Sequence, residues 1–75
     1  MTLELDLRGL RCPLPVLRTK KAMKNMPENG VLSVITSDPG SISDFSAFCS
    51  ATGNKLLESA ERDNLFYFSI QKMGK

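Results

Sequence analysis

The chain has 75 residues, of which 41% are hydrophobic and 24% are charged. This length and composition predict a single globular domain over residues 1–75 and exclude a fibrous repeat or a disordered tail. Ten Lys and Arg against eight Asp and Glu give a net charge of +2. That charge is too small to argue for direct binding of nucleic acid.

Two features of the composition exclude several kinds of site. The chain has no His, and its two cysteines are Cys12 and Cys49. A Cys-His or Ser-His nucleophile pair is therefore impossible, and two Cys cannot complete a four-ligand zinc site. We expect no metal and no cofactor. Because disulfide-built secreted domains usually carry four or more cysteines, we expect both thiols to be free and reduced.

Hydropathy predicts a soluble, cytoplasmic protein without a membrane partner. No apolar run approaches the roughly 18 residues that a membrane span needs. Charged residues at positions 4, 6, 8, 11 and 18 interrupt the first twenty residues, which argues against a signal peptide.

The first half of the chain predicts a strand, a helix and a second strand. Leu3–Leu7 alternates apolar and charged residues, as a half-buried strand does, and Gly9 permits the turn that follows. Pro13 and Pro15 mark the start of a helix that runs to about Met26. Its core-facing stripe is predicted to be Pro15, Val16, Thr19, Ala22, Met23 and Met26. The apolar run from Val31 to Ser37 predicts a strand in the centre of the sheet.

The second half predicts a helix and two strands. After the Asp38-Pro39-Gly40 turn, Ser41 or Ser43 can cap the helix, and Gly53 lies where the helix should stop. The buried face of this helix is predicted to be Ile42, Phe45, Phe48, Cys49 and Thr52. The two strands are predicted over residues 54–61 and 65–71, joined around positions 63 and 64.

This order of elements is strand, helix, strand, helix, strand, strand. Short connections and one apolar stripe on each helix favour a four-stranded mixed sheet with both helices on one face. The predicted fold class is α+β, a two-layer α/β sandwich of order βαβαββ.

Cys12 is the strongest candidate for chemistry. It lies at the start of a helix, where unpaired N–H groups and the helix dipole favour a thiolate. Arg8 and Arg11 precede it in the same loop and could lower its pKa further. A free cysteine can also be a small buried residue of the core. We interpret Cys49 in that way, because it lies within an apolar helical stripe.

One face of the first helix is a candidate for binding a partner protein. Leu14 and Leu17 fall opposite the core stripe, next to Lys21, and could form a docking patch. Isolated surface leucines are also common. Arg18 and the lysines around it are otherwise a solvated helix face. Asp38 and Asp44 are interpreted as turn and capping residues.

The segment from Leu5 to Val16, LDLRGLRCPLPV, resembles the TusA/SirA-like family of small sulfur carriers. It matches the D-x-R-G-x-x-C-P-x-P signature of that family, and the similarity extends from Leu3 to about Gln71. The resemblance implies the βαβαββ fold inferred above. It also implies that Cys12 accepts sulfur as a persulfide, supported by Arg8, Gly9, Arg11, Pro13 and Pro15.

The same resemblance implies the partners. The donor would be a cysteine desulfurase and the recipient an acceptor protein, with tRNA thiolation or another sulfur-trafficking pathway as the end point. Leu14 departs from the tRNA-thiolation member, which carries Glu at that position, so the pathway stays open. A carrier that shows its thiol to two partners is expected to be a monomer without a substrate pocket of its own.

Two other functions remain possible from the sequence. A small α/β domain with a basic helix face could bind RNA or regulate a partner without catalysis, although aromatic residues do not interleave with its basic run. A thiol peroxidase or redox sensor would use Cys12 as well, but it usually needs a resolving cysteine. Cys49, predicted to be buried, does not suit that role.

Overall fold

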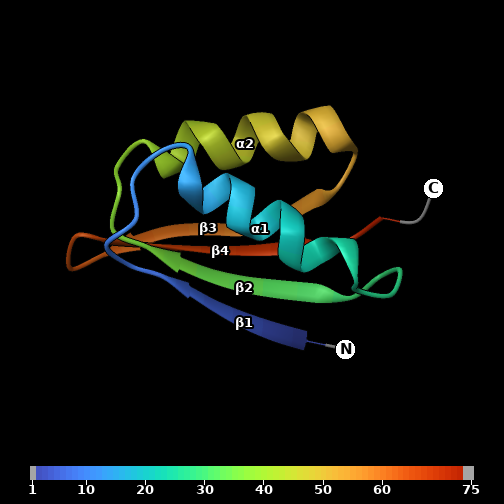
Figure 1. The fold of residues 1–75 in the computed structure, drawn as a ribbon. Coiled ribbons are helices and arrows are strands. Elements are labelled where there is room, and N and C mark those ends of the chain that lie inside the picture. The colour runs from blue at the N-terminus through green and yellow to red at the C-terminus, as the bar shows by residue number, and fades with distance from the viewer. Residues whose placement is uncertain (1, 74–75) are drawn as a thin grey trace.

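The computed structural model describes residues 2–73 of the chain. Its elements in chain order are β1 (Thr2–Leu7), α1 (Leu14–Lys24), β2 (Val31–Thr36), α2 (Ser41–Thr52), β3 (Lys55–Arg62) and β4 (Leu65–Gln71) (Figure 1). This confirms the predicted order. The predicted ends of several elements are displaced by a residue or two, as is usual where hydrogen bonding frays.

The four strands form one mixed sheet in the order β1-β2-β4-β3. Strands β1 and β2 are parallel, and the other two pairs are antiparallel. Both helices lie on one face of the sheet, with α1 against β1 and β2 and α2 against β3 and β4 (Figure 1). The α+β two-layer sandwich is therefore confirmed, as is the inner position of β2. Neither helix in residues 2–73 combines the length and apolarity needed to cross a membrane.

The core lies between the helices and the sheet. Phe45 from α2 is completely buried and stacks on Phe68 from β4, with ring centroids 4.6 Å apart. Met23 of α1 and Cys49 of α2 are also buried. All six residues of the stripe predicted for α1 are buried or half-buried, which confirms the period of that helix.

Two residues predicted for the buried face of α2 are exposed. Ile42 has 46% of its surface exposed, and Thr52 at the end of the helix is exposed too. The buried face runs through Ser41, Phe45 and Phe48, which follow the spacing of one helical face. Ile42 lies at the margin of that face, so much of its side chain stays exposed.

The start of α2 also differs from the prediction. The capping position is Gly40, and neither predicted serine caps the helix through its side chain. Asp38, which lies outside the helix, accepts hydrogen bonds from the backbone N–H groups at its start instead. Its Oδ1 accepts the N–H of Gly40 at 3.1 Å, and its carbonyl accepts the N–H of Ser41 at 2.9 Å.

Three buried hydroxyl groups have no hydrogen-bond partner within residues 2–73, those of Thr19, Thr36 and Ser41. An unpaired buried hydroxyl lowers stability, and an apolar group of the same shape removes that loss. Thr36→Val is therefore expected to raise the free energy of unfolding by about 1 kcal/mol. Urea unfolding measures this. Thr52→Val is the control. The Thr52 hydroxyl already donates a hydrogen bond to the carbonyl of Phe48 at 2.8 Å, so this change should not raise the free energy of unfolding. Loss of stability in Thr36→Val would contradict the prediction.

Candidate functional site

Two loops meet at one edge of the sheet. Because β1 and β2 are parallel and end in register, with Leu7 opposite Thr36, the segments that follow them leave side by side (Figure 1). The backbone N–H of Gly9 donates to Ser37 Oγ at 2.8 Å. The backbone N–H of Cys12 donates to Asp38 Oδ2, also at 2.8 Å. These two bonds hold the Cys12 loop against the start of α2.

Gly9 gives this loop its turn. Its φ of +87° lies in the region that glycine adopts readily and other residues avoid. A Cβ atom added at Gly9 would have no neighbouring atom within 4 Å, so the need for glycine comes from the backbone conformation.

Cys12 is exposed and lies directly before Pro13, the capping position of α1. The Cys12–Pro13 peptide bond is cis. Leu14 donates its N–H to the carbonyl of Arg11 at 2.8 Å, and Pro15 is buried, so both sides of the cysteine are anchored. The loops line a depression of about 650 Å³, formed by residues 9–12 and 37–39. The backbone on both sides of Cys12 is therefore held, and the thiol is exposed.

The charges that act on Cys12 are negative, whereas positive charge from Arg8 and Arg11 was expected from the sequence. Hydrogen bonding to the Asp44 carboxylate raises the pKa of the Cys12 thiol, and desolvation and the negative charges of Asp44 and Asp38 raise it further. A carboxylate nearby disfavours a thiolate. The lowered pKa that the helix start and the nearby arginines could give is therefore not found: the pKa of the Cys12 thiol lies above its ordinary value.

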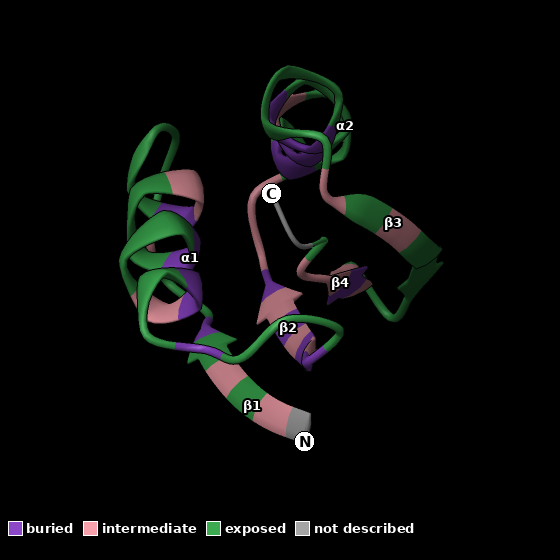
Figure 2. Ribbon diagram, turned by 90° about the vertical axis from the view of Figure 1, so that its right-hand side faces the viewer, coloured by how far each residue is buried: buried purple, intermediate pink, exposed green. Residues whose placement is uncertain are grey.

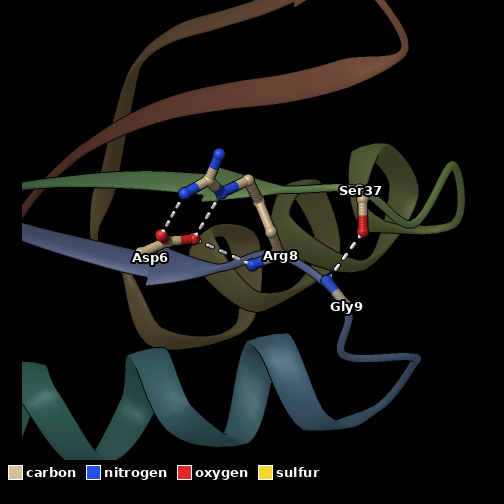
Figure 3. A network of polar contacts seen from close by, with 4 residues as sticks. All are labelled: Asp6, Arg8, Gly9 and Ser37. Carbon is tan, nitrogen blue, oxygen red and sulfur yellow. Dashed lines mark hydrogen bonds and ion pairs between the residues drawn. The ribbon is translucent and has the colours of Figure 1, made fainter.

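Arg8 does not support the thiol electrostatically. Its guanidinium holds the Asp6 carboxylate, with Nε donating to Oδ1 at 2.9 Å and Nη2 to Oδ2 at 2.7 Å (Figure 3). This pair lowers the pKa of Asp6 to about 2. Asp6 alternates with the buried Leu7, so the pair lies on the side of β1 away from the helices. Arg11 lines the same depression as Cys12.

The predicted docking face of α1 is accessible. Leu14 and Leu17 have 43% and 52% of their surface exposed, and Arg18 and Lys21 are exposed as well. Leu17 also lines a groove of about 440 Å³ between the helices. Its apolar side includes Met23 and Phe48, and its basic residues are Lys20, Lys21, Lys24 and Lys72.

The sequence interpretation missed Asp38 and Asp44 as parts of the site. Both were assigned to local turns and caps, whereas the structure brings them to Cys12 from 26 and 32 positions along the chain. The feature of the sequence that could have pointed to this part of the site is the acidic turn directly after a central strand. In residues 2–73, no group of three or more potential metal ligands occurs.

Comparisons with known proteins agree with this geometry. The family model described as sulfurtransferase TusA matches residues 3–72. The sulfur carrier protein TusA of Allochromatium vinosum is 54% identical over 92% of this chain and 91% of its own length. The crystal structure of a SirA-like protein from Desulfitobacterium hafniense superposes with a TM-score of 0.84 at 27% identity, covering 96% of this chain and 99% of that one. The chain belongs to the TusA family of sulfur carrier proteins.

Proposed function

We propose that Cys12 carries sulfur as a persulfide, which it accepts from a cysteine desulfurase and passes to a cysteine of an acceptor protein. The observation that carries the proposal is the accessibility of the two thiols. Cys12 is exposed in an anchored loop, whereas Cys49 is buried in the core. A partner protein can therefore reach one cysteine without unfolding the domain.

Loading is a thiol exchange. The Cys12 sulfur attacks the outer sulfur of the donor persulfide, a new S–S bond forms, and the S–S bond in the donor breaks. The donor cysteine leaves as a thiolate, so the step needs no external oxidant. The departing donor thiolate takes up the proton that the Cys12 thiol loses, so the exchange balances. A persulfide is a stronger acid than a thiol, so the loaded group ionises more readily beside the carboxylates of Asp38 and Asp44.

Unloading repeats the exchange in the opposite sense. A cysteine thiolate of the acceptor attacks the outer sulfur on Cys12, and the Cys12 sulfur leaves and takes up a proton. A raised pKa of the Cys12 thiol is compatible with this cycle, because a thiol resists oxidation better than a thiolate. It also suits a reducing cytoplasm, where thiols persist.

Partners are proposed to dock along the exposed face of α1. Leu14 and Leu17 supply apolar contacts, and Arg18 and Lys21 favour a surface with acidic groups. This face begins two residues after Cys12, so a partner held there reaches the thiol. The end pathway, tRNA thiolation or another sulfur-trafficking route, depends on which acceptor docks.

Transfer of labelled sulfur tests the proposal. The protein is incubated with a cysteine desulfurase and radiolabelled cysteine without reductant, then separated under non-reducing conditions. We expect label on the native protein and on Cys49→Ser, none on Cys12→Ser, and loss of label on reduction. A second known carrier shows that the donor is active. Label retained in a folded Cys12→Ser protein, or lost only in Cys49→Ser, would overturn the assignment.

A further inference from the structure

The sheet has a second face, which the helices leave open (Figure 2). On β2 and β4, burial alternates between buried and half-buried residues, so every second side chain points away from the helices. Ile35 and Tyr67 are two of these half-buried side chains. They line a depression of about 610 Å³ on this face, together with Glu4, Glu58 and Arg62.

Strand register arranges the outward side chains in rows across the sheet. The central row has an apolar middle and consists of Asp6, Ile35, Tyr67 and Ala60. On one side of it is an acidic row: Glu4, Ser33, Ser69 and Glu58. On the other side, Arg62 pairs with Leu65 on β3 and β4, and Arg8 follows β1. Acidic and basic groups therefore flank the apolar centre on opposite sides.

These charges do not neutralise each other within one chain. Glu58 and Arg62 are four residues apart on one strand, or roughly 13 Å at the rise of an extended chain. Glu4 and Arg8 have the same separation. Within residues 2–73 the single ion pair is that of Arg8 with Asp6, and Arg62 lies over the Tyr67 ring at 5.3 Å. The two glutamates and Arg62 keep their charges available to another molecule.

We propose that the open face of the sheet binds a second copy of this chain, through a two-fold axis that runs along the central row. Rotation about that axis places Ile35 and Tyr67 opposite the same residues of the other copy, with the Arg62 guanidinium beside the Tyr67 ring. It also places the two Asp6 residues opposite one another, where each is already paired with Arg8 of its own chain. The same rotation exchanges the two flanking rows, so Glu58 faces the second copy's arginine at position 62. Glu4 faces position 8 in the same way. Each contact occurs twice, as an isologous interface requires.

The size of the face sets the strength of the association. A face four strands wide and six residues long covers roughly 400 Å² per copy. Two such faces bury roughly 800 Å² in total, which is below the range of standard specific complexes and within that of weak, transient ones, so the dimer is expected to be weak and reversible. The dimer leaves Cys12 free, because the thiol lies in the loop edge next to the helix layer. A dimer would replace the monomer expected from the sequence, and this inference does not depend on the sulfur chemistry.

Exchange of the charges at positions 58 and 62 tests the inference, with association measured by sedimentation velocity. Because an interface of this size is expected to be weak, the protein concentration is raised up to about 1 mM. The native protein is expected to associate with rising concentration. Glu58→Arg and Arg62→Glu each place like charges opposite one another, so each alone should weaken association by about tenfold or more. An equimolar mixture of the two variants restores opposite charges at every contact. That mixture, and the double variant, should associate about as tightly as the native protein.

The control is Glu61→Arg, because Glu61 pairs with the inward Phe66 and belongs to the other side of β3. It should associate like the native protein, and thermal melts confirm that all variants fold. A native protein that stays monomeric over the whole range would overturn the inference. So would a Glu61→Arg variant weakened as much as Glu58→Arg, or a mixture no tighter than its components. Sulfur labelling of Cys12 is unaffected by these outcomes, so the two proposals fail separately.

Discussion

Alkylation of Cys12 by iodoacetamide at pH 7 is expected to become several-fold faster when Asp44 is replaced by asparagine. Hydrogen bonding to the Asp44 carboxylate and its charge both raise the pKa of the thiol. Asparagine removes the negative charge, so the pKa should fall and the thiolate fraction at neutral pH should increase. The thiolate is the reactive form. The rate, measured from pH 6 to 10, should therefore show its midpoint at lower pH in the variant.

Glu28→Gln is the matched control for this change. Glu28 is an exposed carboxylate in the turn between α1 and β2. That turn lies at the opposite end of the sheet from the loop between β1 and α1, which contains Cys12 (Figure 1). Removal of the Glu28 carboxylate should leave the midpoint where the native protein has it. An unchanged or higher midpoint in a folded Asp44→Asn protein would mean that Asp44 does not control the thiol.

Replacement of Phe45 by alanine is expected to lower the free energy of unfolding by about 3–5 kcal/mol. Phe45 is completely buried and stacks on Phe68, so its loss removes apolar burial and an aromatic contact and leaves a cavity. A domain of this length has a total stability of only about 4–11 kcal/mol. The change therefore removes a large fraction of the folding free energy.

Urea unfolding of Phe45→Ala and Ile42→Ala measures this effect. Ile42 is on the same helix but 46% exposed, so its replacement should cost less than about 1 kcal/mol. Equal losses in the two variants would contradict the core described above. They would favour instead the helical face expected from the sequence, which included both residues.

Periodicity made most of the fold predictable. The spacing of apolar residues in α1 identified its buried face, and the alternation at Leu3–Leu7 identified β1. Local patterns of this kind reflect which side of an element faces the core. Ile42 shows where prediction from local periodicity fails. It lies at the margin of the buried face, where helical spacing alone does not distinguish burial from exposure.

The candidate site was only partly predictable. Cys12 was identifiable because the prolines that mark the start of α1 are its neighbours in sequence. Asp38 and Asp44 approach it through the parallel pairing of β1 and β2, a contact between distant segments that no local pattern encodes. Arg8 was misinterpreted for a related reason. Strand alternation sends Asp6 to the open face of the sheet, and Asp6 holds the guanidinium there.

The helix layer, with the loop edge beside it, and the open face of the sheet present different groups to solvent. The loop edge holds the exposed Cys12 thiol between two helix starts, and Leu14 and Leu17 are exposed on α1. The outer face of the sheet carries charges that suit a second copy. A small domain can in this way present its thiol and its second surface without either covering the other.

Peptide mass spectrometry after incubation with a cysteine desulfurase and free cysteine, without reductant, tests the central claim most directly. We predict one added, reducible sulfur atom on the peptide that contains Cys12, and none on the peptide that contains Cys49. The added sulfur should leave when a thiol acceptor is supplied after removal of the donor. Absence of added sulfur on Cys12, with the donor active toward another carrier, would contradict the account.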